Sequence, residues 1–110
     1  YFNQKKFRQA VPILQKILSI QPKHPAAHRY LSEIFSEINE HELAIHHFNV
    51  LTLIFPNDYR VFYNFAVLFY QMKDYSRSLS NLNHAYQICH DDPEFLNSIQ
   101  EMIDHIQSIT

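Results

Sequence analysis

The chain has 110 residues, of which 46% are hydrophobic and 18% are charged, and its formal net charge is −2. This length is enough for one small domain with a modest core, and the composition is globular and not that of a disordered segment. The small net charge argues against a nucleic-acid partner, and no apolar run approaches the roughly 18 residues that a membrane-spanning helix needs.

The counts of glycine and cysteine further restrict the possible folds and the cellular compartment. The chain contains no glycine, which disfavours folds built on Gly-rich phosphate loops or tight hairpins. It contains one cysteine, Cys89, which excludes an internal disulfide framework and fits a reducing compartment. We therefore expect a cytoplasmic protein without membrane insertion.

Apolar periodicity and helix-start signals predict a succession of helices. Pro25 and Pro93 stand at first helical positions, where the missing N–H costs nothing, and Pro22 and Pro56 stop the preceding helices. Tyr1 already lies inside a helical pattern, so we expect that the natural chain extends before it. The expected N-caps are Asp58, Asp74 and Asp92. In chain order, the expected helices are 1–4, 7–20, 25–38, 41–54, 59–72, 75–89 and 93–108.

Similar residues recur along the chain with a period of 34. The columns are Pro22 and Pro56; Ala10, Ala44 and Ser78; Phe7, His41 and Tyr75; Leu14, Phe48 and Leu82; Ile17, Leu51 and Ala85; Leu31, Phe65 and Ile99; and Tyr1, Phe35, Phe69 and Ile103. A helical bundle without repeats would not hold one register along the chain. This period therefore indicates repeated helix-turn-helix units.

These columns resemble those of the tetratricopeptide repeat family over essentially the whole chain. The best unit carries the family pattern as His28, Leu31, Ser32, Phe35, Ala44, Phe48, Leu51 and Pro56. The third unit departs at His90, where proline is expected, and the family's usual glycines are replaced by Ser32, Ala66, Asn39 and Lys73. We expect these replacements to loosen the turns and to leave the fold intact.

The resemblance implies an all-α fold, a right-handed superhelix of antiparallel helix pairs, in a single domain over residues 1–110. Residues 1–24 would form a partial repeat, and residues 25–58 and 59–92 two complete repeats. Residues 93–110 would form a capping helix or start a further repeat. The apolar stripe of this last helix suits a cap whose outer face meets water; it comprises Leu96, Ile99, Ile103 and Ile106.

A narrower resemblance is to the translocator chaperones of bacterial type III secretion. The segment Ala44-Ile45-His46, the segment 92–95 and the closure of three repeats by one helix carry it. It implies a cytosolic protein, often a homodimer, that holds an extended segment of its cargo in a concave groove.

The family's groove-lining positions fall on the first helix of each pair. Together the tyrosines, arginines and asparagines at these positions suit a peptide, because they combine large apolar area with polar tips. The alternative is that the tyrosines are partly packed and partly solvated surface. The projected groove positions are Arg29, Tyr30, Glu33, Arg60, Tyr63, Asn64, Val67, Tyr70 and Asn97, together with Glu37, Glu94, Ser98 and Glu101.

A carboxylate clamp for the acidic tails of heat-shock proteins is not expected. Arg29 and Asn64 match two positions of the family's clamp, but Glu33, Glu94 and Ser98 occupy the three where Asn and basic residues are expected. The two glutamates would repel a carboxylate ligand.

The eight histidines do not form a metal-binding pattern. His46 and His47 are adjacent and diverge by about 100° on a helix, while His24 lies at a cap and not on the helix of His28. Glu42 and His46 are the best helical pair, but no third ligand has motif spacing. We expect solvated or half-packed histidines.

Catalytic patterns are also missing from the sequence. Cys89 lies on an apolar helical stripe and reads as a small buried hydrophobic residue, and the pair Asp91-Asp92 reads as a helix N-terminus. No Ser-His-Asp, paired-carboxylate or phosphate-loop signature is present. We therefore expect no enzyme activity and no catalytic, cofactor or metal residues.

Two functions remain open from the sequence. The first is a protein-binding scaffold that takes a peptide or partner segment in its groove, in one version as a secretion chaperone. The second is a structural segment that oligomerises or extends a larger multidomain protein.

Overall fold

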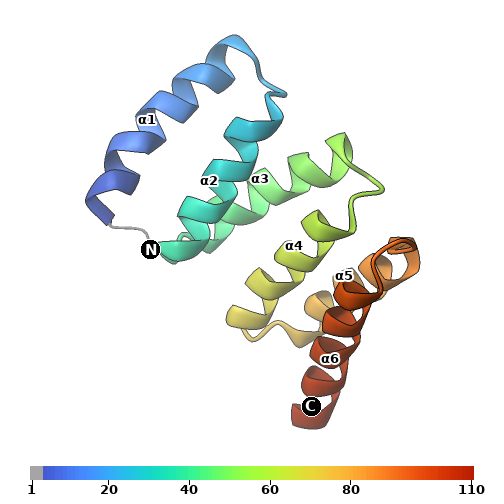
Figure 1. Ribbon diagram of the computed structural model, residues 1–110. Coiled ribbons are helices and arrows are strands. Elements are labelled where there is room, and N and C mark those ends of the chain that lie inside the picture. Colours follow the sequence, from blue (N-terminus) through green and yellow to red (C-terminus); the bar gives the residue numbers. More distant parts are fainter. Residues whose placement is uncertain (1–3) are drawn as a thin grey trace. The chain divides into compact units, whose positions relative to one another are not determined.

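The computed structural model describes residues 4–110, and this range is entirely helices and short turns (Figure 1). The helices α2 to α6 agree with the predicted ranges to within one residue, while α1 begins three residues earlier than predicted; the helix predicted at 1–4 falls almost wholly outside the described residues. The all-α fold class is confirmed. The helices are α1 (Gln4–Ile20), α2 (Pro25–Glu37), α3 (His41–Ile54), α4 (Tyr59–Gln71), α5 (Tyr75–Ile88) and α6 (Pro93–Ile109).

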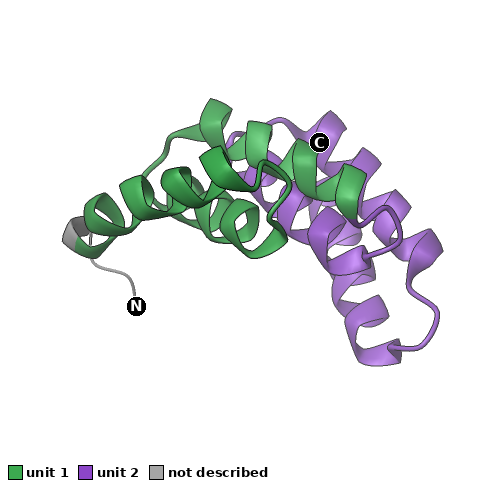
Figure 2. Ribbon diagram, turned by 90° about the horizontal axis from the view of Figure 1, so that it is seen from above, with its two compact units in different colours: residues 1–54 green, residues 55–110 purple. Residues whose placement is uncertain are grey.

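The chain divides into two compact units (Figure 2). Unit 1 comprises residues 1–54 and unit 2 comprises residues 55–110. In unit 1, α2 packs against both α1 and α3; in unit 2, α5 packs against both α4 and α6. Thus α2 packs with α3 and α4 packs with α5, and these are the helix pairs contained in the predicted second and third repeats.

The predicted helix starts are confirmed by side-chain caps. The Asp58, Asp74 and Asp92 carboxylates accept hydrogen bonds from backbone N–H groups in the first turns of α4, α5 and α6. His24, one period before Asp58, caps α2 in the same way, because its Nδ1 accepts from the Ala27 N–H at 3.1 Å. An N-cap of this kind satisfies an N–H group that the helix leaves unpaired.

Two turns adopt a glycine-type conformation without glycine. Asn39 and Lys73, one period apart, both have φ of 63°. Behind them the Glu40 N–H donates to the Phe35 carbonyl at 2.8 Å, and the same bond recurs one period later at 2.9 Å. These are Schellman caps. Both turns therefore close without glycine. Holding a non-glycine residue in the left-handed region costs about 1 kcal/mol of folding free energy at each position.

Small residues lie where the paired helices were expected to meet. Ser32 and Ala44 in the second repeat, and Ala66 and Ser78 in the third, are almost completely buried. The Ser78 Oγ donates across the pair to the Ala66 carbonyl at 2.8 Å, whereas the Ser32 Oγ donates to the Arg29 carbonyl of its own helix at 2.7 Å. The second repeat thus has serine on its first helix and alanine on its second, whereas the third repeat has alanine on its first helix and serine on its second.

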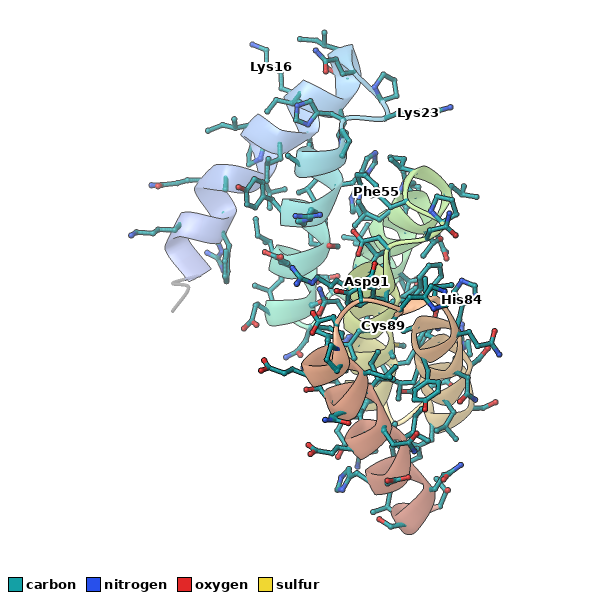
Figure 3. The ribbon with its side chains drawn as sticks, turned by 45° about the vertical axis from the view of Figure 1, so that its right-hand side comes forward. Lys16, Lys23, Phe55, His84, Cys89 and Asp91 are labelled. Atoms are coloured by element: carbon teal, nitrogen blue, oxygen red, sulfur yellow. The ribbon has the colours of Figure 1, made fainter. Side chains whose placement is uncertain are left out.

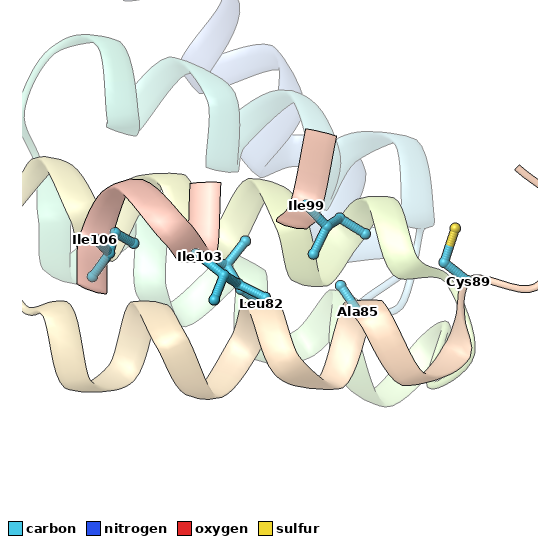
Figure 4. Close-up of a cluster of buried hydrophobic side chains, with 7 residues drawn as sticks. Leu82, Ala85, Cys89, Ile99, Ile103 and Ile106 are labelled. Atoms are coloured by element: carbon cyan, nitrogen blue, oxygen red, sulfur yellow. The ribbon is translucent and has the colours of Figure 1, made fainter. Parts of the chain in front are cut away.

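The core of unit 2 joins α5 to the last helix. Figure 4 shows Ile99, Ile103 and Ile106 of α6 directed toward Leu82 and Ala85 of α5. All five side chains are buried, and burying each Leu or Ile contributes roughly 1.5–3 kcal/mol. The amphipathic stripe predicted for residues 93–110 is confirmed.

Cys89 directly follows α5 and is buried in the same core cluster. Figure 3 labels it together with Asp91 in the turn that leads to α6. Its Sγ lies 3.5 Å from the Asp92 carbonyl oxygen, and burial, with the Asp92 carboxylate second, raises the pKa of the thiol. A raised pKa suppresses the reactive thiolate, so Cys89 packs as a small hydrophobic residue.

The expectation of solvated or half-packed histidines is wrong at two positions. His28 on α2 and His47 on α3 are 3% and 8% exposed, and their rings contact each other. The sequence argument treated each histidine as a lone polar group, but each of these two has a hydrogen-bond partner inside unit 1. His46, the neighbour of His47, is exposed, but its ring meets the His47 ring edge to face with centroids 5.1 Å apart, so the two side chains do not diverge as predicted.

Candidate functional site

The predicted binding residues of unit 2 lie on α4, with Asn97 on α6. Arg60, Tyr63, Asn64 and Val67 are spaced three or four residues apart, which places them along one face of the helix. Contacts between side chains of α4 and α6 show that this face is turned toward α6. We call it the α4–α6 face.

Two of the predicted tyrosines are anchored on α6. The Tyr63 ring is half-buried and meets the Phe95 ring edge to face, with centroids 5.1 Å apart. The Tyr70 hydroxyl and the His105 Nε2 are hydrogen-bonded at 2.9 Å. The tyrosines are therefore partly packed and partly solvated, and their role in binding a peptide stays a prediction. An anchored ring keeps its surface in place and loses little entropy when it is contacted.

A cluster around Arg60 lies at the start of the same face. The Tyr59 hydroxyl donates to the Asp92 Oδ2 at 3.1 Å, and an Arg60 guanidinium nitrogen lies 3.7 Å from the same oxygen. The guanidinium carbon is 5.8 Å from the centroids of both the Tyr59 and Phe95 rings. The Arg60 side chain is still 66% exposed, so this arrangement presents a positioned cation to solvent.

Local contacts determine the protonation states of Asp92 and Tyr59 in this cluster. The Phe95 backbone N–H is the main cause that holds the pKa of Asp92 below its ordinary value, and the Tyr59 hydroxyl and Arg60 add to it. Burial, and then the Asp92 carboxylate, raises the pKa of Tyr59. Asp92 therefore stays a carboxylate and Tyr59 stays a neutral donor at neutral pH.

The amide side chains on the α4–α6 face are exposed. Asn64 and Asn97 are exposed, and Val67, about one turn after Asn64 on α4, is half-buried. A primary amide offers two donors and a carbonyl acceptor, which is the set needed to bind the backbone of an extended peptide.

Unit 1 carries the remaining predicted residues on α2. Arg29, Tyr30 and Glu33 are exposed, and the Tyr30 side chain is one of the largest exposed apolar surfaces, at 55%. Tyr30 and Glu33 border a pocket of about 320 Å³ between α1 and α2. Partial burial raises the pKa of Glu33, and the Arg29 charge acts in the opposite direction. The other residues that line the pocket are Lys6, Phe7, Ala10, Ile13, Leu14 and Ile34.

Sequence reasoning missed the α6 partners of the α4 side chains. Tyr59 and Asp92 are 33 residues apart, Tyr70 and His105 are 35 apart, and Tyr63 and Phe95 are separated similarly. These separations are close to one period, so a search for polar and aromatic pairs about 34 residues apart would have found them. No comparable pattern in the sequence identified the α1 residues that line the pocket beside Tyr30 and Glu33.

Residues 4–110 contain neither a group of metal ligands nor a membrane-spanning helix. No group of three or more His, Cys, Asp or Glu side chains in this range could hold a metal ion. None of the helices α1 to α6 is long and apolar enough to cross a membrane.

Comparison with known proteins agrees with this architecture. The family model described as tetratricopeptide repeat matches residues 1–63. Among solved structures, the chain is similar to the Yersinia enterocolitica type III secretion translocator chaperone SycD, with a TM-score of 0.83 and 18% sequence identity over 94% of this chain and 73% of that one. No curated protein matches the sequence. With its 34-residue period, its helix pairs and the match of its first 63 residues, the chain belongs to the tetratricopeptide repeat family.

Proposed function

We propose that this chain is a non-catalytic scaffold that binds an extended segment of a protein partner on the α4–α6 face, with α2 as a second contact surface. The observation that carries the proposal is the combination on one face of anchored tyrosines, exposed amides and a positioned cation. Tyr63 and Tyr70 are held by α6, and Asn64 and Arg60 reach solvent beside them. All four residues are among the groove positions predicted from the sequence, which supports the proposal.

The chemistry of this face favours a peptide over a small ion or cofactor. Aromatic rings supply apolar contact area, and the Asn64 and Asn97 amides can replace water on the partner's backbone N–H and C=O groups. Hot spots of interfaces are enriched in tyrosine and arginine for the same reason.

A ligand with a free acidic C-terminus is not favoured. Glu33 and Glu94 stand at positions where the family's carboxylate clamp has Asn and a basic residue, and both are exposed. We therefore propose that the partner segment is bound in its interior. Micromolar binding of a peptide ending in Glu-Glu-Val-Asp, lost in Arg29→Ala, would contradict this.

The fold of SycD supports a narrower version, a cytoplasmic secretion chaperone. In this version the partner is an apolar cargo protein encoded beside the chaperone, and the chain masks one of its segments before export. A gene neighbourhood without secretion components would remove this version and leave the scaffold proposal standing.

A matched pair of tyrosines tests the binding face. Tyr30 on α2 and Tyr86 on α5 are 55% and 42% exposed, but only Tyr30 lies among the predicted binding positions. Asn64 provides a second exposed position on α4. With a partner identified by co-purification, Tyr30→Ala and Asn64→Ala should each weaken its binding by roughly 10-fold or more, since interface hot spots contribute about 1–2 kcal/mol or more. Tyr86→Ala should leave it unchanged; equal loss in all three variants would refute the assignment.

The second candidate function is that of an oligomerising segment of a larger protein. Large apolar side chains exposed on α1 favour it, because Ile13 and Ile20 are 64% and 73% exposed. Such side chains together can form an interface between copies. Sedimentation of the chain at micromolar concentration tests this: an Ile13→Glu variant should dissociate a dimer, and a wild-type monomer would contradict the idea.

A further inference from the structure

Two buried histidines face each other in unit 1, away from the exposed binding positions. His28 comes from α2 and His47 from α3, and their Nδ1 atoms are 2.9 Å apart. The Phe35 ring stacks on His47 at a centroid distance of 5.7 Å. The pair thus links the two helices of the second repeat through one hydrogen bond in an apolar surrounding.

The direction of this bond follows from a third group. The His28 Nε2 lies 2.8 Å from the Pro22 carbonyl oxygen in the turn before α2. A carbonyl oxygen can only accept, so the His28 Nε2 carries a proton and donates it. In a neutral His28 the Nδ1 is then an acceptor, and the His47 Nδ1–H must donate to it.

Protonation conflicts with this arrangement. A charged His28 carries protons on both nitrogens, and its Nδ1–H then faces the His47 Nδ1–H unless His47 changes tautomer. A second proton cannot be placed, because two N–H groups would oppose each other across 2.9 Å and two charges would share one buried site.

The surrounding groups do not relieve the conflict. Burial lowers the pKa of His47 to about 4, and His28 on α2 and His46 on α3 act in the same direction. No carboxylate contributes among the described residues. From the turn that joins α1 to α2, the pair meets the Pro22 carbonyl, which accepts from His28 and holds no charge.

A third histidine at the same end of α2 has the same requirement. The His24 Nδ1 accepts the Ala27 N–H as the cap of α2. A nitrogen accepts a hydrogen bond through its lone pair, so the His24 Nδ1 carries no proton in this arrangement. The equivalent caps, Asp58 and Asp92, use carboxylates.

We propose that His28 and His47, supported by the His24 cap, form an acid-sensitive lock that holds α2 to α3 in neutral solution and opens unit 1 as the pH falls through the range in which histidine protonates. Of the two complete repeats, only the one formed by α2 and α3 contains this lock. One period later, Phe62 and Asn81 occupy the positions of His28 and His47, and neither side chain titrates.

The third repeat supplies the test variant. Asparagine at position 47 can donate from its Nδ2 to the His28 Nδ1 and cannot be protonated. For the wild type, the folding equilibrium constant from urea unfolding should fall about tenfold between pH 7.5 and pH 5.5, because the unfolded chain binds a proton that folded His47 excludes. In His47→Asn this drop should shrink to threefold or less. His90→Asn, a change at an exposed histidine of unit 2, should keep the wild-type drop.

Long-range ¹H–¹⁵N spectra of the wild type give an independent readout that needs no variant. At pH 7.5 they should show His28 protonated at Nε2 and His47 protonated at Nδ1, with His47 still neutral at pH 6. The proposal is overturned if His47 is charged at pH 6, if its Nδ1 lacks the proton at pH 7.5, or if His47→Asn and His90→Asn have the same pH dependence.

Discussion

The reversed serine and alanine of the two repeats give the sharpest stability prediction. Ser32 and Ser78 are both almost fully buried, as are Ala44 and Ala66 on the helices that pack against theirs. Only the Ser78 hydroxyl bonds to the partner helix. We expect Ser78→Ala to destabilise the protein and Ser32→Ala to leave its stability unchanged or slightly raised, although the two changes remove the same atom.

The magnitudes follow from three contributions. A helix interior favours alanine over serine by about 0.5 kcal/mol, and this gain applies to both variants. Ser78→Ala also loses a cross-helix bond worth about 1 kcal/mol, while the Ala66 carbonyl keeps its own helical partner and is not left unsatisfied. Ser32→Ala loses only a local bond to the Arg29 carbonyl, which contributes little because it competes with the helix. The difference between the variants should be about 1 kcal/mol.

Urea unfolding at pH 7.5, followed by circular dichroism at the helical band, measures this difference. With a slope of about 1–3 kcal/mol per molar urea, 1 kcal/mol corresponds to a midpoint shift of roughly 0.3–1 M, which is well resolved. Equal slopes would show that the variants unfold the same structure. The reasoning is refuted if Ser32→Ala costs as much as Ser78→Ala, because the cross-helix bond would then contribute nothing.

Five further substitutions test the core, the turns and the cap by the same unfolding measurement. Leu82→Ala, in the buried core of unit 2, should cost about 2–5 kcal/mol, whereas Leu53→Ala, at an 82% exposed side chain, should stay within about 0.5 kcal/mol; similar losses would contradict the packing. Lys73→Gly should stabilise by about 1 kcal/mol and Asn39→Gly by less, because asparagine tolerates the left-handed region better; destabilisation by either would rule out φ of 63°. His24→Asp should stabilise by about 0.5–1 kcal/mol at pH 7.5 through the dipole of α2, and no gain would argue against the cap.

The sequence predicted most of the helical framework. Helix starts follow from proline and aspartate, and those signals act locally, within the first turn of each helix. Helix ends at Asn39 and Lys73 were placed correctly although both lack the glycine usual there, because the 34-residue period fixed their positions. The buried columns, such as Leu31, Phe65 and Ile99, were also identified, because helical periodicity reports which side of a helix is covered.

Side-chain partners across helices were not predicted. The sequence placed Tyr63 and Tyr70 on one face of α4 but gave no information on the rotamers that direct them toward Phe95 and His105 of α6. A face is set by helical geometry, whereas a contact depends on where a second helix lies and which side chain it offers there. For the same reason, the binding role of the face stays a proposal until a partner is measured.

The buried histidine pair shows how equivalent positions in two repeats can differ in chemistry while the backbone stays the same. His28 and His47 occupy the sequence positions that Phe62 and Asn81 occupy one period later, and His24 caps α2 where Asp58 caps α4. In the second repeat all three positions depend on neutral imidazoles, and in the third none does. Since repeat stabilities are roughly additive, mild acid should weaken the second repeat selectively. Acid unfolding should then begin at α2 and α3 while α4 to α6 remain helical, and simultaneous loss of all helices would mean that the histidines do not control it.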